Sequence, residues 1–168
     1  MPGRRRFRAS PGVEHPEAPE AARRAALALL ARRDHSSAEL AAKLTAKGYT
    51  PEAAREAIEA LKIERLLDDA RFLDNFVRAH AGRGQGPLRI RQELAGLGFE
   101  SSTIDAALST GPDFVALCRE VRARKFGAAA PASWAERGRQ ARFLQYRGFS
   151  SDHIRLATGR DPEADQPD

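Results

Sequence analysis

The sequence predicts an all-α protein made of three tandem three-helix repeats that form an elongated, curved array. Three observations predict this fold: a glycine-aromatic step recurs every 50 residues, apolar residues at helical spacing precede each step, and helix-starting residues follow it. No segment has convincing strand character. Alanine is abundant and aromatic residues make up only 7% of the chain, which also favours helices over strands.

The repeat is seen in three tripeptides that lie 50 residues apart: Lys47-Gly48-Tyr49, Leu97-Gly98-Phe99 and Arg147-Gly148-Phe149. The same offset aligns Leu44 with Leu94 and Leu144, Ala57 with Ala107 and Ala157, and Ala54 with Ile104 and Ile154. A glycine just after a helix adopts the left-handed conformation without a Cβ clash, and the following aromatic residue returns to the core. Each tripeptide therefore predicts a tight corner between two helices.

The first unit is predicted to span residues 21–64. Its first helix runs over 21–33, and the polar stretch 34–37 ends it and caps the second helix. Thr50 caps a third helix that runs from Pro51 to Leu67 and bridges the first two units.

The second and third units are predicted at 65–110 and 111–159. In the second, Asp68 or Asp69 caps the first helix, a glycine-rich stretch over 82–86 ends it, and Pro87 opens the next helix. The third unit repeats the pattern, with helix starts at Gly111-Pro112-Asp113 and at Ser150-Ser151-Asp152.

Two terminal segments are expected to lie outside the array. Residues 1–20 carry four prolines and a basic tip and predict a flexible basic arm, and residues 160–168 predict an acidic disordered tail. The longest apolar run, Ala25 to Ala31, is too short to cross a bilayer, and no signal-peptide pattern opens the chain. We expect a cytoplasmic protein.

The charge distribution favours an anionic partner. The net charge is +5, and 24 of the 28 basic residues are Arg, whose planar guanidinium suits phosphate and carboxylate, although genomic base composition can also enrich Arg. Residues 50–75 carry seven acids and four bases, a balance of −3. Residues 111–160 carry ten bases and four acids, a balance of +6, which favours a contact surface in the third unit.

Motifs for catalysis or cofactor binding are weak. The four histidines have no metal-ligand spacing, and the lone Cys118 lies at an apolar helical position that indicates a packed thiol. The stretch 82–86 lacks the pattern of a nucleotide-binding loop, but free N–H groups of the helix that begins at Pro87 could hold a nucleic-acid phosphate near Arg83 and Arg89. We expect no enzymatic activity, cofactor or metal.

Two further patterns have structural explanations beside functional ones. Asp68 and Asp69 could form an acid-base or metal dyad, but their place at a helix start favours capping. Trp134, Phe143, Tyr146 and Phe149 could stack on bases, but core packing explains most of them better, and Tyr146 is the least certain.

The chain resembles the RecX family, regulators of the recombinase RecA, over residues 22–158. The residues that carry the resemblance are Ala26 to Arg32 ahead of Ser37-Ala38-Glu39-Leu40, Leu66-Leu67-Asp68-Asp69-Ala70-Arg71-Phe72, Arg83-Gly84-Gln85-Gly86-Pro87-Leu88-Arg89-Ile90 with Glu93-Leu94, Arg124-Lys125-Phe126-Gly127, and Arg142-Phe143-Leu144 before Arg147-Gly148-Phe149. Departures are modest: Gln85 and Leu88 stand at positions that often differ in relatives, and the terminal arms are particular to this chain.

The resemblance implies a three-repeat helical protein that binds the RecA filament along its groove. Such a protein restrains the recombinase, ATPase and coprotease activities of RecA in DNA repair, recombination and the SOS response, without catalysis of its own. We expect a monomer that also binds single- or double-stranded DNA weakly and without sequence preference. From the basic residues of the second and third units, the expected contacts to RecA or DNA are Arg71, Arg78, Arg83, Arg89, Arg91, Arg119, Arg122, Arg124, Lys125, Arg139 and Arg142.

A stand-alone basic DNA-binding helical module is the alternative, because three-helix units with a basic helix also occur in helix-turn-helix domains. This alternative predicts tight, salt-sensitive DNA binding in the absence of a recombinase. The spread of basic residues over several units favours the filament regulator. A passive scaffold for other proteins would depend on neither DNA nor a recombinase.

Overall fold

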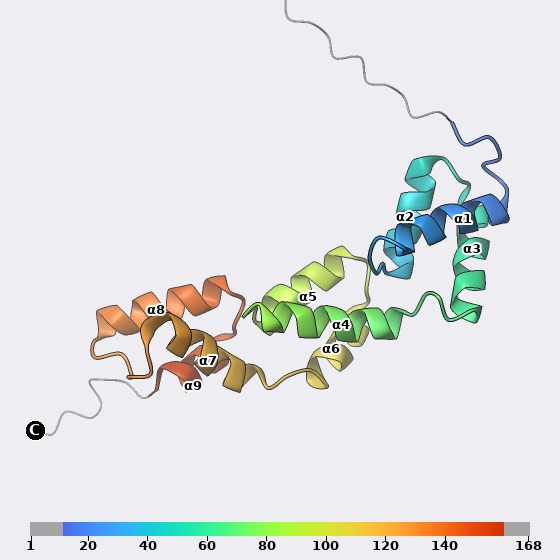
Figure 1. Ribbon diagram of the computed structural model, residues 1–168. Helices are drawn as coiled ribbons and strands as arrows, with labels where there is room; N and C mark the ends of the chain where they lie inside the picture. The colour runs from blue at the N-terminus through green and yellow to red at the C-terminus, as the bar shows by residue number, and fades with distance from the viewer. Residues whose placement is uncertain (1–11, 160–168) are drawn as a thin grey trace, which may run out of the picture. The chain divides into compact units, whose positions relative to one another are not determined.

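The structure, a computed structural model, describes residues 12–159, and this part of the chain contains nine helices and no strand (Figure 1). The predicted all-α fold is therefore confirmed. Residues 1–11 of the predicted basic arm and the whole predicted acidic tail lie outside the described residues. The described residues form two compact units, divided between Phe72 and Leu73, and each is described by itself.

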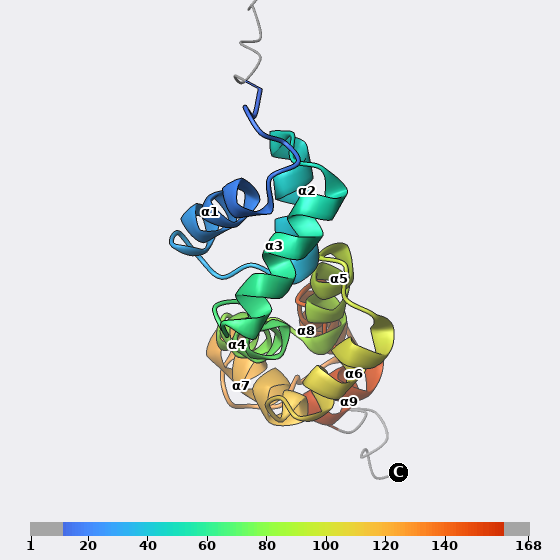
Figure 2. The ribbon, with the colours of Figure 1, turned by 90° about the vertical axis from the view of Figure 1, so that its right-hand side faces the viewer.

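The first unit contains α1 (Pro19–Leu30), α2 (Ser37–Lys47), α3 (Pro51–Ile63) and the start of α4 (Asp69–Gly82). Figure 2 shows α1, α2 and α3 gathered around a common centre. The core consists of fully or nearly fully buried aliphatic residues from α1, α2 and α3 and from the segment after α3: Ala26, Leu40, Leu44, Ala54, Ile58, Leu61 and Leu67. A second contact of small residues, Ala22 with Ala53 and Ala57, lets the backbones of α1 and α3 approach closely.

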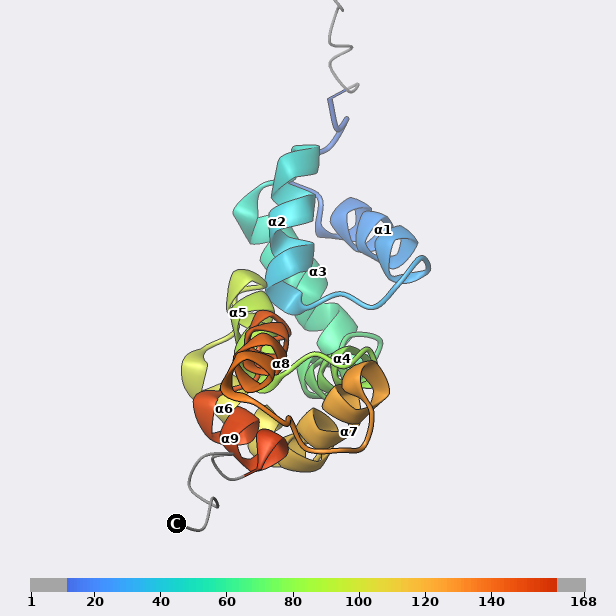
Figure 3. The same cartoon turned by 90° about the vertical axis from the view of Figure 1, so that its left-hand side faces the viewer.

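The second unit contains the rest of α4, α5 (Pro87–Gly96), α6 (Ser101–Ser109), α7 (Phe114–Phe126), α8 (Trp134–Tyr146) and α9 (Ser151–Thr158). Figure 3 shows α8 and α9 beside α7, with which they share a core. That core is formed by Cys118, Val121, Leu144, Phe149, Ile154 and Ala157. Burial raises the pKa of Cys118 to about 11, so its thiolate is scarce and its role is packing.

The three predicted corners share one hydrogen-bond pattern. Gly48, Gly98 and Gly148 have φ angles of 107°, 88° and 90°, in the left-handed region. In each corner the aromatic N–H donates to a leucine carbonyl (Tyr49 to Leu44 at 3.1 Å, Phe99 to Leu94 at 3.3 Å, Phe149 to Leu144 at 3.1 Å), and the glycine N–H donates three residues back. This is the Schellman motif, and it confirms the corners that the repeat predicted.

The helix predicted to run from Pro51 to Leu67 is wrong at its end, because α3 stops at Ile63. Arg65 has φ of 58°, and its N–H donates to the Lys62 carbonyl while the Leu66 N–H donates to the Leu61 carbonyl. This is again a Schellman motif, with arginine where the repeats have glycine. Without a glycine the sequence carried no signal for this corner, which turns the buried Leu67 into the core.

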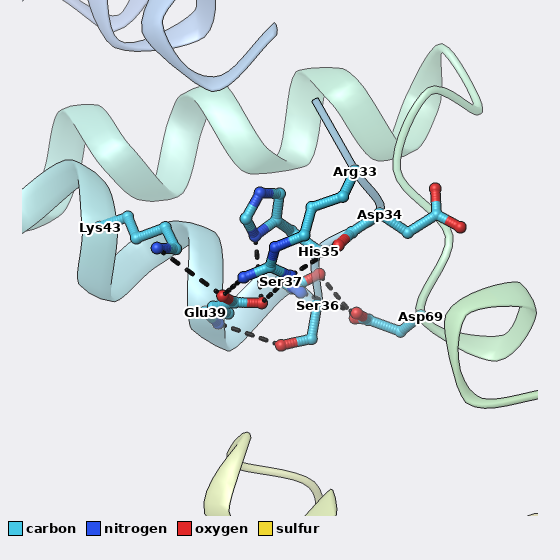
Figure 4. A network of polar contacts seen from close by, with 8 residues as sticks. All are labelled: Arg33, Asp34, His35, Ser36, Ser37, Glu39, Lys43 and Asp69. Carbon is cyan, nitrogen blue, oxygen red and sulfur yellow. Dashed lines mark hydrogen bonds and ion pairs between the residues drawn. The ribbon is translucent and has the colours of Figure 1, made fainter. Parts of the chain in front are cut away.

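A polar network joins the start of α2 to the start of α4 within the first unit (Figure 4). Ser37 donates from its N–H to Asp69 Oδ1 at 2.8 Å and from its hydroxyl to Asp69 Oδ2 at 2.6 Å. Asp68 accepts from the Arg71 N–H at 3.0 Å. Of the two alternatives for this acidic pair, the structure thus supports capping by Asp68, while Asp69 bridges two helices.

Glu39 is the centre of the same network. Its carboxylate pairs with Arg33, with His35 Nδ1 at 3.0 Å and with Lys43 Nζ at 3.8 Å, and the His35 ring is only 4% exposed. Burial alone would raise the pKa of Glu39, but hydrogen bonds from Arg33 and His35 and their charges outweigh it, so the pKa lies below its ordinary value.

Glu39→Gln is expected to lower the free energy of unfolding of the first unit by about 2 kcal/mol at pH 7. Because the folded-state pKa is lowered, the charge contributes fully above the usual glutamate pKa of about 4.3 and is lost as pH falls through the folded value. Urea unfolding from pH 7 to pH 3 checks this: the two proteins should converge at acid pH. Glu56→Gln, exposed on α3, is the control, and a difference that is independent of pH would contradict the assignment.

Candidate nucleic-acid interface

A cationic pocket in the second unit brings together side chains from three elements. Arg83 and Gly84 come from the α4–α5 loop, Val121, Arg124 and Lys125 from the end of α7, and Phe143 and Arg147 from the end of α8, around a volume of about 150 Å³. Lysine and arginine in the last turn of α7 also suit the negative end of its helix dipole.

Two close contacts hold the pocket together. Arg147 Nη1 donates to the Arg83 carbonyl at 3.1 Å, and the Arg147 guanidinium lies 5.4 Å from the centre of the Phe143 ring. Lys125 Nζ lies 6.0 Å from the centre of the same ring. Gly84, at φ of 77°, lets the loop lie against α7, since a Cβ there would come within 3.0 Å of Val121 Cγ2.

The pocket is strongly positive. Four cationic side chains line it and no acidic residue does. Arg124 pairs with Glu120 one turn away, whereas within residues 12–159 neither Arg83 nor Lys125 forms an ion pair. Converging cations around a volume of this size suit the oxygens of a phosphate or carboxylate group.

The structure brings three of the eleven expected contact residues into this pocket: Arg83, Arg124 and Lys125. Three others are ion-paired: the exposed Arg78 with Asp74 at 3.1 Å, the exposed Arg89 with Glu93 at 3.0 Å, and the half-buried Arg91 with Asp105. Arg119 is exposed and donates to the Leu156 carbonyl at 3.3 Å. Arg139 and Arg142 are exposed on α8, and Arg71 is exposed in the first unit.

Arg122 corrects an expectation, because it is buried rather than part of the surface. Its side chain is 7% exposed and donates to the carbonyls of Ala128 at 3.0 Å and Ala129 at 2.9 Å and to Gln140 Oε1 at 3.3 Å. The guanidinium therefore fixes the α7–α8 loop onto α7 and is not available to a partner. Its helical spacing from the exposed Arg119 gave no sign of this burial.

The N-terminus of α5 corrects a second expectation. The Gly86 N–H donates to the Arg147 carbonyl at 2.8 Å, and the Leu88 N–H donates to the Gly148 carbonyl at 3.0 Å. The corner between α8 and α9 thus occupies the place where a phosphate was expected. A Cβ on Gly86 would lie 2.4 Å from the Gly148 backbone, which leaves no room for an anion.

Arg147 is the pocket residue that sequence reasoning missed. It belongs to one of the repeated tripeptides and was explained there as part of the corner. The available signal was its position in the repeat, where Lys47 and Leu97 stand in the other units, so a charge is not required for the corner itself.

Residues 12–159 show neither a metal-binding cluster nor a membrane-spanning helix. No group of three His, Cys, Asp or Glu residues within 12–159 could hold a metal ion. No helix in the same range is long and apolar enough to cross a membrane.

The fold and the pocket define a class: a protein of consecutive three-helix units with a cationic surface suited to anions. Family models assign each unit, with the first three-helix domain of RecX matching residues 22–61, the second 68–108 and the third 113–158. The chain belongs to the RecX family, which confirms the resemblance.

Curated relatives match over most of the chain. Regulatory protein RecX of Halorhodospira halophila is 48% identical over 150 residues, which cover 89% of this chain and 93% of that protein. Regulatory protein RecX of Pseudomonas fluorescens Pf-5 is 46% identical over 142 residues, or 83% and 92% of the two chains.

Solved structures support the fold. The crystal structure of RecX from Lactobacillus salivarius matches with a TM-score of 0.70 at 22% identity, covering 81% of this chain and 91% of that one. A second RecX crystal structure matches with a TM-score of 0.67, also at 22% identity, over 83% and 70% of the two chains.

Proposed function

We propose that this chain is a regulatory protein that binds the RecA nucleoprotein filament and mainly inhibits its recombinase, ATPase and coprotease activities. It acts as a monomer, without catalysis of its own, in the control of DNA repair and recombination. The observation that carries the proposal is the similarity of 89% of the chain to a protein named regulatory protein RecX. The cationic pocket supports it, since it offers a phosphate or carboxylate four cationic groups.

Hydrolysis of ATP by RecA on single-stranded DNA, titrated with this protein, tests the proposal. DNA binding by the protein alone is measured alongside. Inhibition of hydrolysis at concentrations where little free DNA is occupied supports a filament regulator. An unchanged hydrolysis rate together with tight DNA binding would reject the filament regulator and leave the stand-alone DNA-binding module.

Reversing the charge of the pocket is expected to weaken the interaction. In the triple variant Arg83→Glu, Arg124→Glu, Lys125→Glu, the slope of log affinity for DNA against log salt should fall by about 3, because each lost phosphate contact removes roughly 1. Inhibition of RecA should weaken in parallel. Fluorescence anisotropy from 50 to 200 mM salt measures the slope.

The control for this variant has the same total change in charge at exposed positions of the first unit: Arg24→Glu, Lys47→Glu, Arg55→Glu. Equal loss of affinity in the two triple variants would show that overall charge, and not the pocket, governs binding. Circular dichroism of both variants verifies that the helices remain folded.

A further inference from the structure

A groove between α5, α8 and α9 in the second unit has no part in the function proposed above. Its volume is about 1020 Å³, and none of its lining residues also lines the cationic pocket. Its lining comes from these helices and from the corner between α8 and α9, and the second unit has no strand among its described residues. An occupant therefore has no sheet edge to pair with and must bind through side chains.

The floor of the groove is apolar. Phe149 and Ile154 belong to the core of the second unit, and Ala141 packs against that core. At the mouth, Leu88 is 51% exposed and Tyr146 is 82% exposed. Large apolar side chains exposed beside a groove mark a surface that binds another molecule, and tyrosine is among the residues that most often carry binding energy.

The walls of the groove are positive. Arg89, Arg137 and Arg155 line it, against one carboxylate, that of Glu93. Glu93 is already paired with His80 Nε2 at 3.0 Å and with Arg89 Nε at 3.0 Å. The groove therefore offers unbalanced positive charge above an apolar floor.

Arg137 is the side chain in these walls that most needs an acceptor. Its Nη1 atom is inaccessible to solvent and has no hydrogen-bond partner, and its guanidinium lies 5.7 Å from the centre of the Trp134 ring. Arg155, which lines the groove from α9, lies 3.3 Å from Asp152. The Arg137 residue as a whole is only half-buried, and a carboxylate that enters the groove can accept two guanidinium N–H groups at once.

We propose that this groove binds an acidic amphipathic helix of a partner protein. Apolar side chains of that helix contact Phe149 and Ile154, and its carboxylates pair with Arg137 and Arg155. A helix laid in a groove between helices is a common mode of recognition. Two other occupants fit the groove less well. Nucleic acid supplies negative charge but no aliphatic side chains for the floor. Residues 160–168 of this chain contain four acids but no large apolar residue. The acidic amphipathic helix matches both floor and walls.

The test uses the full chain and a synthetic peptide of 16 residues, with leucine along one helical face and glutamate elsewhere. Binding measured by calorimetry should be lost or weakened at least about tenfold in Arg137→Glu, Arg155→Glu. The matched control, Arg139→Glu, Arg142→Glu, has two reversals on exposed residues of α8 that do not line the groove, and it should bind normally. Amide shifts of Ala141, Ser151 and Thr158 locate the peptide by NMR.

The proposal would be overturned if a peptide with glutamine in place of glutamate bound as tightly as the acidic peptide. It would also be overturned if Arg139→Glu, Arg142→Glu lost as much affinity for the acidic peptide as Arg137→Glu, Arg155→Glu. Binding that appears only after the chain is cut behind Gly159 would assign the groove to residues 160–168 instead. Self-association that disappears in Arg137→Glu, Arg155→Glu would assign it to a second copy. Neither DNA nor RecA enters these measurements, so their outcome is separate from that of the proposed function.

Discussion

Gly148→Ala is expected to lower the free energy of unfolding of the second unit by about 3 kcal/mol or more. Two effects add: a left-handed φ of 90° is strained for alanine by about 1 to 2 kcal/mol, and overpacking adds about 1 to 3 kcal/mol. The new Cβ would lie 2.4 Å from Arg89 Cβ and 2.7 Å from the Arg89 backbone nitrogen. Neither a corner nor a helix start can move aside without losing its hydrogen bonds.

Two matched variants separate these effects. Gly48→Ala is strained by its φ of 107°, but its Cβ meets only Val13 Cγ2 at 3.6 Å, so about 1 to 2 kcal/mol is expected. Gly86→Ala has an ordinary φ of −82°, but its Cβ would lie 2.4 Å from the Gly148 carbonyl group, so it reports overlap alone. Urea denaturation should rank Gly148→Ala as the most destabilising. If Gly148→Ala and Gly48→Ala lowered the free energy of unfolding equally, the close approach of α5 to the corner at Gly148 would be wrong.

The helical repeat could be predicted because its signals are local. A left-handed residue after a helix favours glycine, so the three corners appear in the sequence as Gly48, Gly98 and Gly148. The corner at Arg65 has the same geometry without the glycine and could not be seen. The contact between Gly86 and Gly148 was also hidden, because two backbones that touch leave no side-chain pattern.

The cationic surface could be predicted only in part. Net charge over a segment is additive, so the balance of +6 over residues 111–160 pointed to the third unit without the fold. Which of these cationic side chains come together in the pocket depends on where the loops between the helices lie. Arg83 meets Lys125 and Arg147 because the α4–α5 loop lies against α7, and Arg122 is buried because the α7–α8 loop returns over it. Helical periodicity in the sequence does not reveal where either loop lies.

Arg122→Met is the second variant with a large expected effect, about 3 kcal/mol on the free energy of unfolding of the second unit. Methionine keeps much of the buried stem but leaves the carbonyls of Ala128 and Ala129 and the Gln140 side chain without the donors they now have. Gln140 is fully buried, and leaving a buried polar group unpaired costs about 1 to 3 kcal/mol, whereas Ala128 and Ala129 are exposed and their carbonyls can bond to water. The α7–α8 loop should also become sensitive to proteolysis, since the guanidinium fixes it.

Arg119→Met is the control for Arg122→Met. Arg119 lies one helical turn earlier on α7, is exposed, and makes one long hydrogen bond of 3.3 Å to the Leu156 carbonyl, so its replacement should cost within about 0.5 kcal/mol. Urea denaturation and limited proteolysis of both variants make the comparison. A stable Arg122→Met that loses DNA or RecA binding would reverse the correction made above and return Arg122 to the contact surface. A destabilised Arg122→Met beside a stable Arg119→Met would show that the same residue type, three positions apart, holds the fold at one site and lies at the surface at the other.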